Sequence, residues 1–182
     1  MGSYQAWLVD AFSSVPSVAA VMRTSWGWPI VESIHFIGLT LLFGTIAAWD
    51  LRLIGVARRV PIAAFHRLVP LAVLGFAINA ASGSMFLMTE PTQYVYNPAF
   101  HFKLLFMTLA GLNVLVFYST LFRRLGTLPA GVNPPPSARI IGAASLACWM
   151  GVIICGRLIT FYRPLPCLEG EAVGFFVYCI LR

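Results

Sequence analysis

The stretch that decides the fold is "WPIVESIHFIGLTLLFGTIAAW", residues 28–49, which is almost entirely apolar. An α-helix needs about 20 such residues to cross the roughly 30 Å hydrocarbon core of a bilayer. Three further stretches of this kind follow, at residues 68–88, 103–122 and 140–161. The whole chain is 59% hydrophobic and 10% charged, whereas soluble domains carry about 25% charged residues. The sequence therefore predicts an all-α, polytopic membrane protein.

The links between the four stretches are short, which favours antiparallel neighbours. We expect an up-down-up-down bundle of four transmembrane helices over residues 26–163. Residues 1–25 then form an N-terminal segment with a short interfacial helix, in which Trp7 and Phe12 suit the membrane surface. Residues 164–182 form a C-terminal tail. Its Cys167 and Cys179 could form a disulfide in an oxidising compartment, and the sequence leaves this open.

The net charge of +6 is distributed unevenly along the chain. Seven arginines lie in or beside the first and third links: Arg52, Arg58, Arg59, Arg67, Arg123, Arg124 and Arg139. Short loops rich in Lys and Arg stay in the cytoplasm, so we expect both termini to face outward. No base-reading motif accompanies this charge. The basic residues therefore indicate topology, and a nucleic-acid partner is not expected.

Ionisable residues inside the apolar stretches are the candidate functional residues, because burying them in lipid costs free energy. At about 1.5 Å of rise per residue, they fall in one layer of the outer leaflet, roughly 25 to 30 Å from the bordering arginines. This layer contains Glu32, His35, Met85, Lys103 and Arg157. We expect Glu32 to form an ion pair with Arg157, Lys103 or both. Deeper in the membrane, Asn79 and Asn113 are expected to hydrogen-bond across the bundle.

A metal site is the chemistry that this layer suggests. His35 shares a helical face with Glu32, and Met85 lies at a similar depth. Imidazole and thioether together suit Cu(I), or a haem iron with mixed axial ligands. His101 is a further candidate ligand, although it lies one to two turns further out than His35. A methionine at helical spacing can equally be core filling, and the ionic residues can serve only to fix helix register.

Several motifs resemble an uncharacterised bacterial family of four-helix integral membrane proteins. The resemblance covers about residues 26–163 and is carried by "WPIVESIHFIGLTLLFG", "DLRLIG" (50–55), "NPAFHFK" (97–103), "GLNVLVF" (111–117) and "GAASLACWMGVIICGRLITFY" (142–162). More distantly, these motifs are similar to CopD-type copper-resistance proteins and four-helix b-type cytochromes. The resemblance implies the inner membrane of a bacterium and a site centred on His35. The tail departs from the pattern, so nothing is implied for it.

Three functions remain open at this point. The first is handling of a transition metal, copper by the resemblance, at His35 with Met85. The second is electron transfer by one haem b with His35 as an axial ligand. The third is a non-catalytic helical subunit that binds a membrane or periplasmic protein. The sequence contains no arrangement of a nucleophile and a base, so we do not expect an enzyme.

Overall fold

The computed structural model describes residues 4–13, 15–125, 131–168 and 178–180. Over these residues the chain forms helices and one isolated β-bridge, between Pro166 and Ile180. The all-α prediction is confirmed. The helices are α1 (Tyr4–Ser13), α2 (Pro16–Met22), α3 (Gly27–Ile54), α4 (Ile62–His66), α5 (Val69–Thr89), α6 (Pro91–Val95), α7 (Pro98–Thr120), α8 (Phe122–Leu125) and α9 (Pro136–Phe161).

Four of these elements are long and apolar enough to cross a membrane: α3, α4 with α5, α7 and α9. They coincide with the four apolar stretches of the sequence. Their outward faces carry large apolar side chains such as Leu115 and Ile140, which are 66% and 68% exposed. Such faces suit contact with lipid, since a soluble protein rarely exposes apolar surface on this scale.

Proline, asparagine and glycine set the ends of the long helices. Pro98 and Pro136 occupy first turns, where the missing N–H is not needed. The side chain of Asn97 accepts a hydrogen bond from the Ala99 N–H and so caps α7. Helix α3 ends at Gly55, whose φ of 114° is a left-handed conformation that favours glycine.

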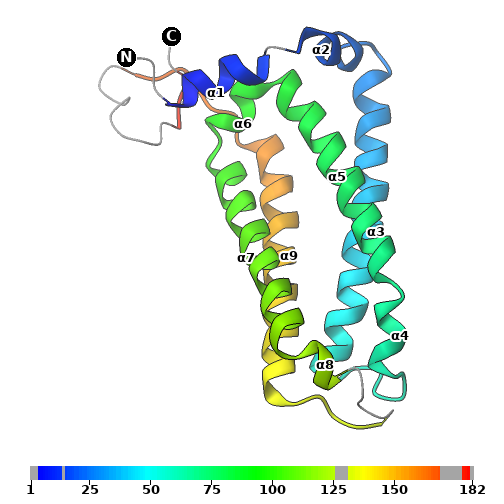
Figure 1. The fold of residues 1–182 in the computed structure, drawn as a ribbon. Coiled ribbons are helices and arrows are strands. Elements are labelled where there is room, and N and C mark those ends of the chain that lie inside the picture. Colours follow the sequence, from blue (N-terminus) through cyan, green and yellow to red (C-terminus); the bar gives the residue numbers. More distant parts are fainter. Residues whose placement is uncertain (1–3, 14, 126–130, 169–177, 181–182) are drawn as a thin grey trace.

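The long helices form two antiparallel pairs, α3 with α5 and α7 with α9 (Figure 1). The pairs are joined through α3 and α9, which also pack together. On the other side, α5 and α7 have no comparable packing contact, although both helices are fully described. The expected up-down-up-down order is present, with one side of the bundle left open.

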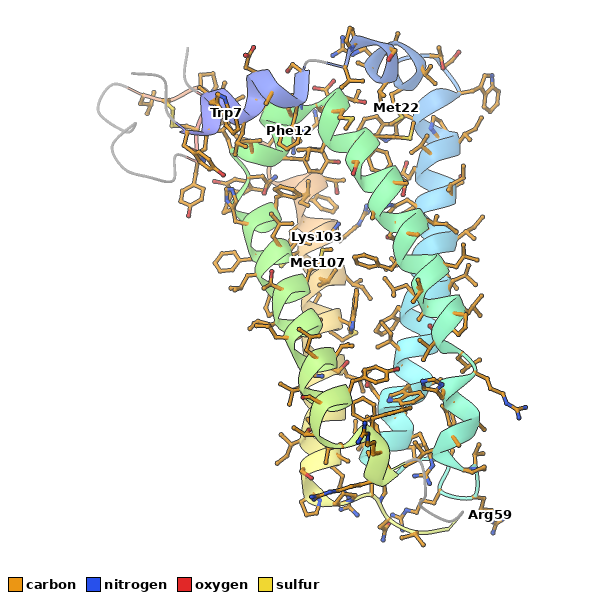
Figure 2. All side chains as sticks on the ribbon, in the orientation of Figure 1. Trp7, Phe12, Met22, Arg59, Lys103 and Met107 are labelled. Atoms are coloured by element: carbon orange, nitrogen blue, oxygen red, sulfur yellow. A yellow bond between two sulfur atoms is a disulfide. The ribbon has the colours of Figure 1, made fainter. Side chains whose placement is uncertain are left out.

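We call the end where α1, α2 and α6 lie the terminal end, and the opposite end, near α4 and α8, the loop end (Figure 1). At the terminal end α1 crosses the bundle, and the buried Gln5 donates to the Val95 carbonyl at 3.3 Å. Helix α2 places Met22 in a cluster with Val31 and Phe86 (Figure 2). The expected N-terminal helix is therefore present, and α2 adds a second. In the tail, Cys167 and Cys179 form a disulfide.

Candidate functional site

His35 lies on the face of α3 that packs against α5. Its Nδ1 is 2.7 Å from the hydroxyl oxygen of Ser82, and its ring contacts the edge of Phe86. The Ser82 hydroxyl itself donates to the Ile78 carbonyl at 2.6 Å. Because that hydroxyl proton is already engaged, Ser82 accepts from His35, and Nδ1 carries the proton. This tautomer leaves Nε2 of His35 with a free lone pair.

Both predicted interhelical asparagines are confirmed. Asn79 of α5 donates to the His35 carbonyl on α3 at 3.3 Å, and also to Gly75 within its own helix at 3.2 Å. Asn113 of α7 donates to the Ile141 carbonyl on α9 at 3.1 Å. Each asparagine thus joins the two helices of one pair.

The two other predicted metal ligands have different neighbours. Met85 packs against the apolar cluster of Met22, Val31 and Phe86 at the terminal end. The ring contacts of His101 are with Phe100 and Tyr178. Among the described residues, these contacts do not bring His101 to His35. No three His, Cys, Asp or Glu side chains of the described part of the chain form a group that could hold a metal ion.

The expected ion pair between Glu32 and Arg157 is wrong. Within the described residues, the ion pair that forms is Arg23 with Glu90, at 3.6 Å. Arg157 is exposed and lies over the ring of Phe161, 4.9 Å from its centre. The physical reason is helical geometry: Cys155 and Ile159 are buried, and a residue two positions from each lies on the opposite face. Equal depth along the helices did not mean a shared face.

Glu32 instead affects Tyr94, which lies outside the membrane-spanning segments in α6. Burial, together with the negative charges of Glu32 and Glu90, raises the pKa of the Tyr94 phenol to about 12. Tyr94 therefore stays neutral at physiological pH. The negative charge of Glu32 thus acts on α6 at the terminal end.

Lys103 extends from α7 towards the inside of the bundle, on the same face as Met107 (Figure 2). A methyl group added to Gly156 of α9 would lie 3.7 Å from the Lys103 ammonium nitrogen, so the side chain runs along α9. Across the bundle, the charge of Lys103 reaches His35. Among the described residues, no carboxylate lies within ion-pairing distance of it.

A cavity of about 400 Å³ opens between the two helix pairs in the half of the bundle near the loop end. All four long helices contribute to its lining, including Leu42 of α3, Phe76 of α5, Met107 of α7 and Trp149 of α9. Helices α5 and α7, which have no comparable packing contact with each other, both line the cavity. Ligand pockets commonly have volumes of about 300 to 1,000 Å³ and mostly apolar walls. This cavity meets both conditions.

Polar groups converge on the α3 and α9 wall of this cavity. Asp50 is 4% exposed and shares a side-chain hydrogen bond with Ser145 of α9, which is also buried. The second carboxyl oxygen of Asp50, Oδ2, has no hydrogen-bond partner among the described residues. Within the same part of the chain, the indole Nε1 of Trp149 is also buried without a partner. Buried polar atoms without partners are rare and costly in native proteins, and a bound ligand is one reason to retain them.

Arg52 closes the loop end below the cavity. It is 1% exposed, and its guanidinium group donates to the Val60 carbonyl at 2.7 Å and to the Arg58 carbonyl at 3.3 Å. The following loop is thereby folded back onto α3. The charge of Arg52, which we interpreted as a topology signal, also fixes this loop.

The prediction from sequence missed the cavity and its polar wall. Asp50 carried one signal, since it is a carboxylate at the end of an apolar stretch. Ser145 and Trp149 carried none, because serine and tryptophan are ordinary residues of transmembrane helices. Only the arrangement of the helix pairs brings the three side chains to one cavity.

The amino-acid sequence matches no family model, no curated protein and no solved structure with which we compared it. The structure is therefore the basis of the proposals that follow.

Proposed function

We propose that this protein is an integral membrane protein that binds a lipid-soluble ligand in the cavity between its helix pairs. The observation that carries the proposal is the pair of unpartnered polar atoms, Asp50 Oδ2 and Trp149 Nε1, on residues that line one apolar cavity. The open side between α5 and α7 gives entry from the bilayer. The protein would reside in a bacterial inner membrane, with both termini outside.

The two unpartnered atoms define the polar part of the ligand. The indole N–H of Trp149 can donate a hydrogen bond, and Oδ2 of Asp50 can accept one, or donate one when the carboxyl group is protonated. A hydroxyl group both donates and accepts, so it can bond either atom. The ligand class is thus a long-chain or polycyclic alcohol whose apolar body fills the cavity and whose hydroxyl group lies at Asp50 and Trp149.

Binding of a fluorescent long-chain alcohol to the detergent-solubilised protein tests this proposal. We expect saturable binding that an unlabelled alcohol competes for better than the corresponding alkane does. Asp50→Leu and Trp149→Phe should each weaken binding about five- to tenfold, because each removes one hydrogen bond worth about 1 kcal/mol.

Two glycine substitutions provide a matched comparison. Gly111 lines the cavity and has no atom within 4 Å of an added methyl group, so Gly111→Leu places a larger side chain at the cavity wall. Gly44 is equally unobstructed and is not part of the lining. Gly111→Leu should abolish saturable binding and Gly44→Leu should preserve it. Equal binding by both variants would contradict the proposal.

Handling of a transition metal at His35 is the second candidate function. The observation in its favour is the tautomer: Ser82 holds the protonated Nδ1 and leaves Nε2 free, as outer-shell partners do for metal-binding histidines. Copper or haem b bound there would depend on His35, with Met85 as the nearest predicted partner in α5. Elemental analysis and a visible spectrum of the protein from its native membrane test this candidate. His35→Ala should remove any bound copper or Soret band, and His101→Ala should leave copper in place.

A further inference from the structure

From the sequence we expected Glu32 to pair with Arg157, Lys103 or both, and within the described residues the ammonium group of Lys103 has no ion pair. The side chain is half-buried, inside a helix that can span the membrane. Among the described residues, it makes neither a hydrogen bond nor an ion pair. A charged group in this position is costly unless an opposite charge or water accompanies it.

The surroundings of Lys103 favour an anion. On α9, the side chain lies beside Gly156, where the lack of a side chain leaves room next to the ammonium group. On α3, the facing ionisable group is His35, which is neutral or positive and not negative. Glu32, the carboxylate expected here, acts on Tyr94, and within the described residues it forms no ion pair with Lys103. Cys155 of α9 also lies near Lys103, and an ordinary thiol is neutral at physiological pH. The ionisable side chains around Lys103 thus contribute no negative charge.

The position of Lys103 along the bundle sets which anion can reach it. It lies five residues into α7 from Pro98, about 7 to 8 Å below the terminal end of the helix. A lysine at that depth can extend its ammonium group towards the membrane interface. Helices α5 and α7 also lack the packing contact that joins the other neighbouring long helices. An oxyanion can therefore arrive as the phosphate of a lipid headgroup through this side, or as a free ion from the terminal end.

We infer that Lys103 is the centre of an anion site in the terminal half of the bundle, which binds a phosphate-type oxyanion. This site is separate from the apolar cavity at Asp50, so either proposal can fail while the other holds.

The test measures thermal unfolding of the full-length protein in two settings. In nanodiscs, phosphatidylcholine alone, whose choline group balances the phosphate charge, is compared with phosphatidylcholine plus the anionic phosphatidylglycerol. In non-ionic detergent, inorganic phosphate replaces chloride at constant ionic strength. We expect the anion to raise the unfolding midpoint of the wild-type protein by about 3 to 6 °C, because a ligand that binds only the folded state stabilises it. A shift with phosphatidylglycerol alone identifies a lipid headgroup, and a shift with inorganic phosphate as well identifies a free anion.

Three variants assign the effect to Lys103. Lys103→Met removes the charge at similar size and should abolish the shift, whereas Lys103→Arg should keep it. The matched control is Arg157→Met, which removes an exposed charge from the outer face of α9 and should leave the shift intact. The inference is overturned if the wild-type protein responds to neither anion. It is also overturned if Lys103→Met shifts as much as the wild type.

Discussion

At the scale of single residues, polar side chains in this bundle are distinguished by the helix face on which they lie. Glu32 and Arg157 share a depth but not a face, and they form no ion pair. Asn79 and Asn113 lie on faces that meet a neighbouring helix, and each bonds a carbonyl there. Depth follows from counting residues in the sequence. The helix face of a residue can be inferred only when one knows which neighbouring positions are buried. These helices are apolar on all faces, so the sequence does not show which positions those are.

Asn97 is the polar residue whose loss should cost most stability. It is fully buried, and its side chain caps α7 while donating to the carbonyls of Ile159 and Tyr162 at 3.3 and 2.7 Å. Asn97→Ala removes the cap and both of these bonds, and leaves the two carbonyls with the Gln93 amide as their side-chain donor. The free energy of unfolding should fall by about 2 to 4 kcal/mol. Reversible unfolding in mixed detergent micelles measures this loss.

The matched control for Asn97 is Ser84→Ala. The Ser84 hydroxyl is exposed, and it bonds only the Ala80 carbonyl within its own helix. Its substitution should change the free energy of unfolding by less than about 0.5 kcal/mol. A similar loss in both variants would show that Asn97 does not tie α7 to the end of α9.

At the scale of elements, the helix pairs depend on small residues where two backbones approach. A methyl group added to Gly75 of α5 would lie 2.6 Å from the Leu42 nitrogen and 2.8 Å from the Gly38 carbonyl oxygen on α3. These are backbone atoms, which have no rotamer to adopt. The α3–α5 contact that positions His35 against Ser82 therefore requires glycine at this position.

Gly75→Ala should destabilise the protein by about 1 to 3 kcal/mol, because it forces α3 and α5 apart. Gly44→Ala provides the control, since no atom lies within 4 Å of its added methyl group. Alanine has a higher helix propensity than glycine, so this variant should be neutral or up to about 1 kcal/mol more stable. Reversible unfolding in mixed detergent micelles measures the free energy of unfolding of both variants. Equal effects would mean that the two helices can separate at no cost.

At the scale of the whole molecule, the sequence predicted the architecture and missed the cavity. Helix number and bounds follow from the length of the apolar stretches, because the bilayer sets that length. The cavity depends on α3 packing against α9 while α5 and α7 stay apart. Which helices pack together depends on how side chains that are distant in the sequence fit each other. All four long helices have similar apolar composition, so the sequence does not show which two remain unpaired. The polar wall of Asp50, Ser145 and Trp149 could therefore not be predicted from the sequence.

The remaining prediction is the orientation of the whole molecule in the membrane. Two independent features predict that both termini face outward. Seven of the twelve basic residues lie in or beside the links at the loop end, which predicts that this end is cytoplasmic. The disulfide between Cys167 and Cys179 lies in the tail beyond α9, and such bonds persist in oxidising compartments. A reporter that is active only outside the cytoplasm should therefore work when it is fused after Arg182, and a cytoplasmic reporter should not. Alkylation of the denatured protein provides the second measurement: without reduction it should label Cys148 and Cys155 alone, and after reduction all four cysteines. A cytoplasmic reporter that works at Arg182, together with four free thiols, would reverse the orientation and place the Lys103 site in the inner leaflet.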